Sequence, residues 1–143
     1  MKTPYDTAMR VQRREIYAMG VAINVQVNLL NQIETARDEA RASIQREADV
    51  AAGDLGLSSH AYMERIRAEQ QRLTRDGAVQ NARLDQMRGK AAAAYGAFRA
   101  VEVAAEGFRE DANRRNANAE QAGVDDSAAV AFLKARRAMQ TGR

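Results

Sequence analysis

The chain has 143 residues, of which 45% are hydrophobic and 29% are charged, and its formal net charge is +3. Alanine supplies 30 of the hydrophobic residues, whereas Phe and Tyr together supply seven and Trp none, so the large side chains that fill a globular core are scarce. The absence of Cys excludes disulfides and cysteine-based zinc sites. With only one Pro and nine Gly, the chain has few turn signals, which favours an all-α fold over all-β or α/β folds.

A first helix is predicted over about residues 4–52. Thr3 can cap it, Pro4 suits the first helical position, and Asp6 completes a capping box. Apolar residues then recur every seven positions, in two rows three residues apart, which is typical of a coiled coil. The rows contain Met9, Ile16, Ile23, Leu30, Ile44 and Ala51, and Met19, Ile33 and Ala40. Arg37, Gln12, Gln26 and Glu47 interrupt them.

A turn is predicted at residues 53–58, where Gly53, Gly56 and Ser58 interrupt the helical pattern. A second helix is predicted over about residues 59–121, again with two heptad rows. The rows contain Ile66, Leu73, Met87, Ala94, Val101 and Phe108, and Met63, Leu84, Ala91, Phe98, Ala105 and Ala112, with Gln80, Gln70 and Gly77 as gaps.

Two long helices joined by one short turn are expected to fold back on each other as an antiparallel two-helix coiled-coil hairpin. We therefore expect residues 1–143 to form a single elongated hairpin, at least about 90 Å long from the rise of about 1.5 Å per residue. Gly77, Gly89 and Gly96 are expected to let the two backbones approach closely.

The C-terminal part of the chain is predicted to form a short separate helix over about residues 127–140, because Gly123, Asp125, Asp126 and Ser127 signal a helix end and a restart. This segment turns basic, with Lys134, Arg136, Arg137 and Arg143 and no acidic residue after Asp126. The cations can complement the helix dipole, bind nucleic acid, or dock on an acidic protein surface.

No catalytic, cofactor or metal site is predicted, so we expect a protein that is not an enzyme. Gly89 and Lys90 lack the Gly and the Ser or Thr of a phosphate loop, since Leu84 and Ala91 occupy those places. The single His60 has no nucleophile or carboxylate constellation around it in the sequence and is expected to be solvated or to cap a helix. Near the turn, Leu57, Tyr62 and Met63 are candidates for a partner-binding tip.

No apolar run approaches the roughly 20 residues of a membrane span, and the N-terminus lacks the layout of a signal peptide, so a cytoplasmic protein is expected. The small basic excess, without aromatic residues interleaved among the cations, disfavours a nucleic-acid partner.

The chain resembles the FliJ family of flagellar type III export proteins in the order of its segments. These are a short lead, a heptad helix, a Gly-containing turn, a longer second helix and the terminal stretch AEQAGVDDSAAVAFLKARRAMQTGR. The run at residues 49–53 also resembles the stretch before the turn of that family. Family members commonly carry Tyr near the end of the first helix, where this chain has Asp38 and Ala42.

The resemblance implies a non-enzymatic cytoplasmic stalk that binds the export ATPase ring and links it to the export gate and to export chaperones. It implies that Lys134, Arg136 and Arg137 lie at the ATPase-binding end, and that the tip near Leu57, Tyr62 and Met63 contacts the gate. Two other interpretations stay open, namely a basic helical hairpin that binds nucleic acid or the ribosome, and a generic coiled-coil scaffold.

Overall fold

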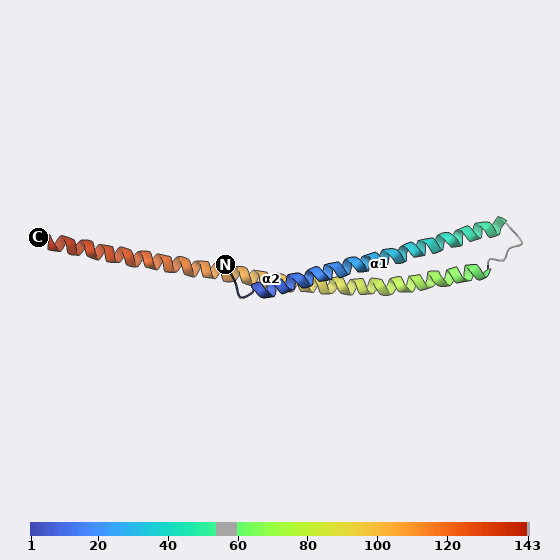
Figure 1. The fold of residues 1–143 in the computed structure, drawn as a ribbon, viewed down its shortest axis with the longest axis horizontal. Coiled ribbons are helices and arrows are strands. Elements are labelled where there is room, and N and C mark those ends of the chain that lie inside the picture. The colour runs from blue at the N-terminus through green and yellow to red at the C-terminus, as the bar shows by residue number, and fades with distance from the viewer. Residues whose placement is uncertain (54–59, 143) are drawn as a thin grey trace. The chain divides into compact units, whose positions relative to one another are not determined.

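The computed structural model describes residues 1–53 and 60–142, and over these ranges the protein is all-helical with no strand, as predicted. The helices are α1 (Asp6–Gly53) and α2 (His60–Thr141), drawn in Figure 1. The chain divides into two compact units, unit 1 with Met1–Arg10 and Phe98–Arg143, and unit 2 with Val11–Ala97. The predicted turn at 53–58 lies, except for Gly53 at the end of α1, outside the described residues.

The start of α1 contains the predicted capping interaction. The backbone N–H of Thr3 donates to Oδ2 of Asp6 at 3.0 Å, and the Thr3 hydroxyl donates to Oδ1 of the same carboxylate at 2.6 Å. These hydrogen bonds hold the pKa of Asp6 below its ordinary value of 3.8, and the bond from the Thr3 hydroxyl has the larger effect. The helix begins at Asp6 and not at Pro4, because residues 4 and 5 form the preceding turn.

The predicted heptad rows are the least exposed positions of both helices. Every row position from Met9 to Ala51 on α1, and from Met63 to Ala112 on α2, is buried or half-buried, including the polar gaps. The most buried apolar members include Met9, Leu73, Leu84, Phe98 and Ala105. Since α1 and α2 each present a narrow stripe of this spacing, burial of the two stripes is what makes such long helices stable.

In unit 2, α1 and α2 pack against each other through these rows. The Nε2 group of Gln26 donates to the backbone oxygen of Gln80 at 3.0 Å and to its Oε1 at 2.8 Å. Farther along α1, Cγ2 of Ile33 lies 3.6 Å from the place where a Cβ on Gly77 would stand. The partner number on α2 falls as the number on α1 rises, so the helices of this unit run in opposite directions.

The glycines of α2 differ in their surroundings. Gly77 is buried against Ile33, as expected for a residue at a close approach. Gly89 and Gly96, in contrast, are exposed and have nothing within 4 Å of an added Cβ, so the expectation that they bring the backbones together is wrong. The heptad spacing explains the difference, because Gly77 lies on a buried row whereas Gly89 and Gly96 lie off both rows.

In unit 1, the first residues of the chain contact α2. Met9 is 6% exposed and Ala105 is fully buried. Nη2 of Arg109 lies 3.8 Å from Oδ1 of Asp6, which places the capping carboxylate beside α2. Both side chains of this ion pair are more than a third exposed, so it contributes little to stability.

The expected helix end near 121 and restart at 127 differ from the structure, in which α2 passes through both positions and ends at Thr141. No described glycine has a positive φ, so Gly123 does not adopt the left-handed conformation that ends helices. Nε2 of Gln121 donates to Oδ1 of Asp125 at 3.0 Å, an i, i+4 contact that supports the continuous helix there. Among the described residues, no helix is long and apolar enough to cross a membrane.

Candidate interaction surfaces

The C-terminal arm, defined as residues 113–142, is exposed at every position. It carries large apolar side chains that are between 51% and 79% exposed, namely Val124, Val130, Phe132, Leu133 and Met139. Large apolar side chains on a helix are ordinarily covered by another part of the protein or by a partner, but no part of the described chain covers these. The arm is therefore a candidate binding surface.

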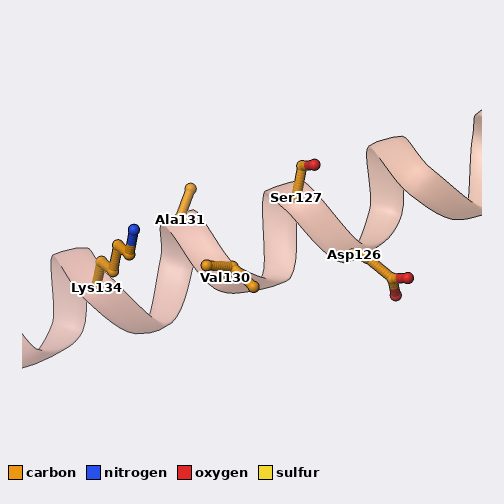
Figure 2. A pocket seen from close by; sticks show the side chains of 5 residues that line it. All are labelled: Asp126, Ser127, Val130, Ala131 and Lys134. Carbon is orange, nitrogen blue, oxygen red and sulfur yellow. The ribbon is translucent and has the colours of Figure 1, made fainter.

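The predicted basic residues of the arm lie around the helix and not in one patch. Lys134 and Arg137 are three residues apart and share a side, whereas Arg136 falls on a different side of the helix. Lys134 lines a shallow hollow with Asp126, Ser127, Val130 and Ala131, and Figure 2 shows Ser127, Ala131 and Lys134 extending to one side while Asp126 points to the other. A partner could contact cationic and apolar groups together on this side.

The predicted tip is described only in part. Tyr62 is 37% exposed and is available to a partner. Met63 is half-buried, because it belongs to a heptad row. Leu57 lies outside the described residues. His60 is exposed and its Nε2 lies 3.1 Å from Oε1 of Glu64, one turn away, which agrees with the expectation of a solvated histidine.

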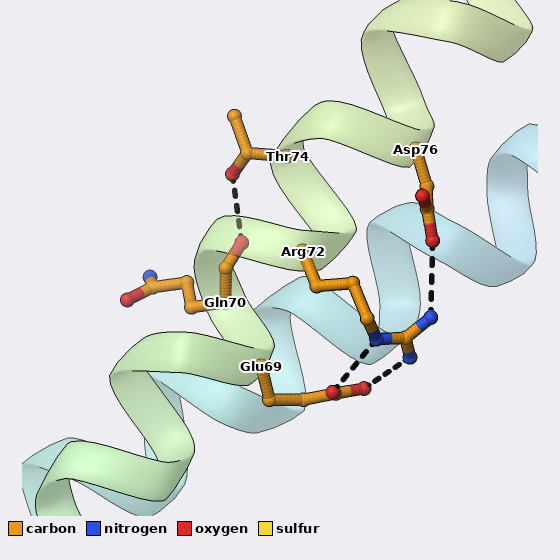
Figure 3. A network of polar contacts seen from close by, with 5 residues as sticks. All are labelled: Glu69, Gln70, Arg72, Thr74 and Asp76. Carbon is orange, nitrogen blue, oxygen red and sulfur yellow. Dashed lines mark hydrogen bonds and ion pairs between the residues drawn. The ribbon is translucent and has the colours of Figure 1, made fainter.

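A polar network lies along α2 in unit 2, as drawn in Figure 3. Nε of Arg72 donates to Oε2 of Glu69 at 2.9 Å, and its Nη1 donates to Oδ2 of Asp76 at 3.1 Å. The hydrogen bonds from Arg72 lower the pKa of Glu69, and those to Glu69 raise the pKa of Arg72. The charged forms of Glu69 and Arg72 therefore stabilise each other on an exposed part of the helix surface.

A small hollow between the helices of unit 2 lies beside Gly77. Leu30, Ile33, Glu34, Arg37 and Asn81 complete its lining. Nε of Arg37 is buried and, within the described ranges, has no hydrogen-bond partner. Arg37 occupies the heptad position where the sequence pattern expects an apolar residue, so it is a weak point of the row. Residues 1–53 and 60–142 contain no group of three or more His, Asp or Glu side chains that could hold a metal ion.

The sequence interpretation missed one surface, the outer side of α1. Tyr17, Val21, Val25 and Leu29 are 76%, 48%, 64% and 38% exposed. They fall within residues 16–33, a stretch of 18 residues without Asp, Glu, Lys or Arg in a chain that is 29% charged overall. That absence of charge is the signal that could have found this surface, because the solvent side of a helix is ordinarily charged.

The chain thus offers an exposed arm in unit 1 and an uncharged outer side of α1 in unit 2, and neither has the enclosed geometry of an active site. In comparisons with known proteins, no family model, no curated protein and no solved structure matches this chain.

Proposed function

We propose that the protein is a non-enzymatic stalk component of a bacterial flagellar type III export apparatus. In this proposal α1 and α2 form an antiparallel two-helix coiled coil with a C-terminal extension. The C-terminal arm binds the export ATPase ring, and the predicted tip near the turn, with Tyr62, contacts the export gate. Export chaperones are further partners, and the protein works at the cytoplasmic face of the inner membrane through them.

The observation that carries the proposal is the C-terminal arm, which stays helical although every residue in it is exposed. From residue 127 to the end the sequence has Lys134, Arg136, Arg137 and Arg143 and no acid. A helix with exposed apolar side chains and a positive charge fits an opening lined by apolar and acidic groups on another protein. The terminal stretch is also the part on which the resemblance to the FliJ family depends.

The basic residues of the arm have a defined role in this proposal. They attract the arm to acidic loops and orient it, which affects the association rate and the specificity more than the affinity. Because Lys134, Arg136 and Arg137 surround the helix, they suit a partner that encloses the arm better than one with a flat surface.

The test is stimulation of the flagellar export ATPase of the same organism by the purified chain. Reversing Lys134, Arg136 and Arg137 together to Glu is expected to weaken stimulation about tenfold, if each charge contributes roughly 0.5 kcal/mol. The matched control reverses Arg65, Arg67 and Arg75, which are exposed on α2 outside the arm. Helicity by circular dichroism should be the same in all three proteins.

Unchanged stimulation by the arm variant at physiological salt would contradict the proposal. Tyr62→Ser tests the other end, since it should weaken binding to the export gate and leave ATPase stimulation intact. Loss of stimulation from this tip change alone would also count against the assignment of the two ends.

A nucleic-acid partner is the competing function, and the same basic residues favour it. Binding through several phosphates weakens by orders of magnitude between about 50 mM and 200 mM salt. Electrophoretic binding assays with duplex DNA and with ribosomal RNA across this salt range separate the two functions. Tight binding with that steep salt dependence, removed by the arm charge reversal, would support nucleic acid in place of the ATPase.

A further inference from the structure

The glutamine pair, Gln26 and Gln80, lies in the heptad rows where α1 packs against α2 in unit 2. Gln26 is 6% exposed and Gln80 is half-buried. Their two hydrogen bonds, at 3.0 Å and 2.8 Å, join residues that are 54 positions apart in the chain. A polar pair in such a row stabilises a coiled coil less than two apolar residues would, so its contribution has to be something other than stability.

The apolar rows alone allow several alignments of the two helices. Because both helices repeat every seven residues, a slip of α1 along α2 by one heptad puts the rows back on each other. Such a slip brings each glutamine opposite an apolar residue of the other helix. For Gln26 these residues are Leu73 and Met87, and for Gln80 they are Met19 and Ile33. Either slip therefore leaves both amides without their hydrogen bonds and against apolar groups, which is unfavourable.

We propose that the glutamine pair sets the register of α1 against α2 in unit 2. The apolar row residues hold the helices together, and the glutamine pair selects the alignment in which Gln26 faces Gln80. Without the pair, the helices have alternative alignments that differ by steps of one heptad, about 10 Å along the axis. The proposal is independent of the export function, since it uses no residue of the C-terminal arm or of the tip.

The other contacts between the helices of this unit are apolar and less selective. Met19 and Met87 line the same small hollow, and the flexible methionine side chain fits many surroundings. Cγ2 of Ile33 lies 3.6 Å from the place of a Cβ on Gly77, an ordinary van der Waals separation. Apolar contacts do not depend on direction, whereas a hydrogen bond needs its donor and acceptor about 3 Å apart. The glutamine pair therefore discriminates between alignments more sharply than these contacts do.

The first experiment measures the alignment with two spin labels. The chain has no Cys, so labels attach only at introduced cysteines. Tyr17→Cys and Arg67→Cys are suitable, because both residues are exposed and lie outside the rows. With Gln26 facing Gln80, Tyr17 is level with about residue 89 of α2, so the labels are roughly 33 Å apart along the axis. Pulsed electron paramagnetic resonance resolves the change of about 10 Å that a slip of one heptad produces.

The labelled chain with its glutamine pair should give one distance. The double variant Gln26→Leu with Gln80→Leu should give a second distance, about 10 Å longer or shorter, because the slipped forms no longer contain two unpaired amides. That change favours the slipped forms by about a hundredfold. The matched control is Gln12→Leu with Gln70→Leu, which replaces two half-buried row glutamines that do not face each other, and it should keep one distance. Dilution with unlabelled chain removes distances between molecules.

The second experiment moves one member of the pair along α2. In a chain that keeps Gln26, Gln80→Leu is combined with Met87→Gln, so the number of polar row residues stays the same. The alignment with Gln26 opposite residue 87 brings Tyr17 level with about residue 96, and the distance between the labels should become about 10 Å longer. Leu73→Gln in place of Met87→Gln should make it about 10 Å shorter, because it favours the opposite slip.

A single, unchanged distance in the double leucine variant would mean that other contacts set the register, and the proposal would be wrong. Two distances in the chain with its glutamine pair would also overturn it. If the double leucine variant loses helix content by circular dichroism, the chain with Gln80→Leu and Met87→Gln decides. An unchanged distance there, with full helix content, contradicts the proposal, and a longer one supports it.

Discussion

Replacing Gln26 with Leu is expected to destabilise the protein although leucine is the residue that a heptad row ordinarily prefers. Gln26 is only 6% exposed, and its Nε2 group donates to both the backbone oxygen and Oε1 of Gln80. With leucine at this place, the Gln80 side chain loses its buried donor while it remains against an apolar group. Leaving a polar group in this state costs about 1 to 2 kcal/mol, or about tenfold in the folded-to-unfolded ratio.

The two single variants should lose different amounts of stability. In Gln80→Leu, Gln26 still has the backbone oxygen of residue 80 as an acceptor at 3.0 Å in the wild-type geometry, so about half of the loss is expected. In the double variant no unpaired amide is left, and two leucines can pack in the rows. We expect its free energy of unfolding to equal or exceed that of the wild type.

Urea denaturation followed by circular dichroism at helical wavelengths measures all four proteins of this cycle. Gln86→Leu is the control, because Gln86 is exposed on α2 and its loss should cost almost nothing. If the double variant were less stable than either single variant, or if Gln26→Leu were neutral, the hydrogen bonds between Gln26 and Gln80 would not be what stabilises this layer.

Three further predictions follow from the described contacts. Arg37→Leu should raise the free energy of unfolding by about 1 kcal/mol in urea denaturation, because it removes a buried Nε without a partner and restores an apolar heptad residue; a loss would mean that this atom is satisfied in solution. Gly89→Ala should raise thermal stability by about 0.5 to 1 kcal/mol, since a Cβ there meets nothing within 4 Å, and a lower melting temperature would contradict this geometry. The pKa of Asp6 is lowered in the folded state, so the stability that Asp6 contributes is fully present above its ordinary pKa of 3.8 and is lost as the pH falls through the lower folded pKa. The difference in stability between the wild type and Asp6→Asn should therefore disappear on acidification. A constant difference from pH 7 to about pH 2 would refute the role of Thr3.

The sequence predicted the all-helical fold and the buried rows because a seven-residue repeat has few other physical explanations. It even placed the polar gaps, since Gln12, Gln26 and Gln80 occupy row positions that are buried or half-buried in the structure. The contact between Gln26 and Gln80 was not predictable, because a heptad pattern gives the face of each residue and not its partner on the other helix.

The predicted break at Gly123 shows a different limit. Gly, Asp and Ser are poor helix formers, but each costs at most about 1 kcal/mol, and a helix already formed on one side can continue through them. Of the predicted interaction residues, Tyr62 and the three cations of the arm are exposed, Met63 is half-buried, and their proposed partners stay predictions. The exposed apolar residues on the outer side of α1, such as Tyr17 and Val25, were not predicted, because a heptad repeat identifies only the buried face of a helix.

The exposure of the C-terminal arm has consequences for its hydrogen exchange and for the temperature dependence of its binding. A helix without a packed face frays from its free end, and each peptide bond that melts there gains conformational entropy and loses only one solvent-exposed hydrogen bond. Gly123 lowers the local helix propensity and is a natural place for the boundary between helix and coil to rest. Amide hydrogens from there to Thr141 should exchange with solvent fastest, and a bound partner should slow them one turn after another. The affinity of the arm for that partner then falls with rising temperature, because at higher temperature more of the arm has to refold before it can bind.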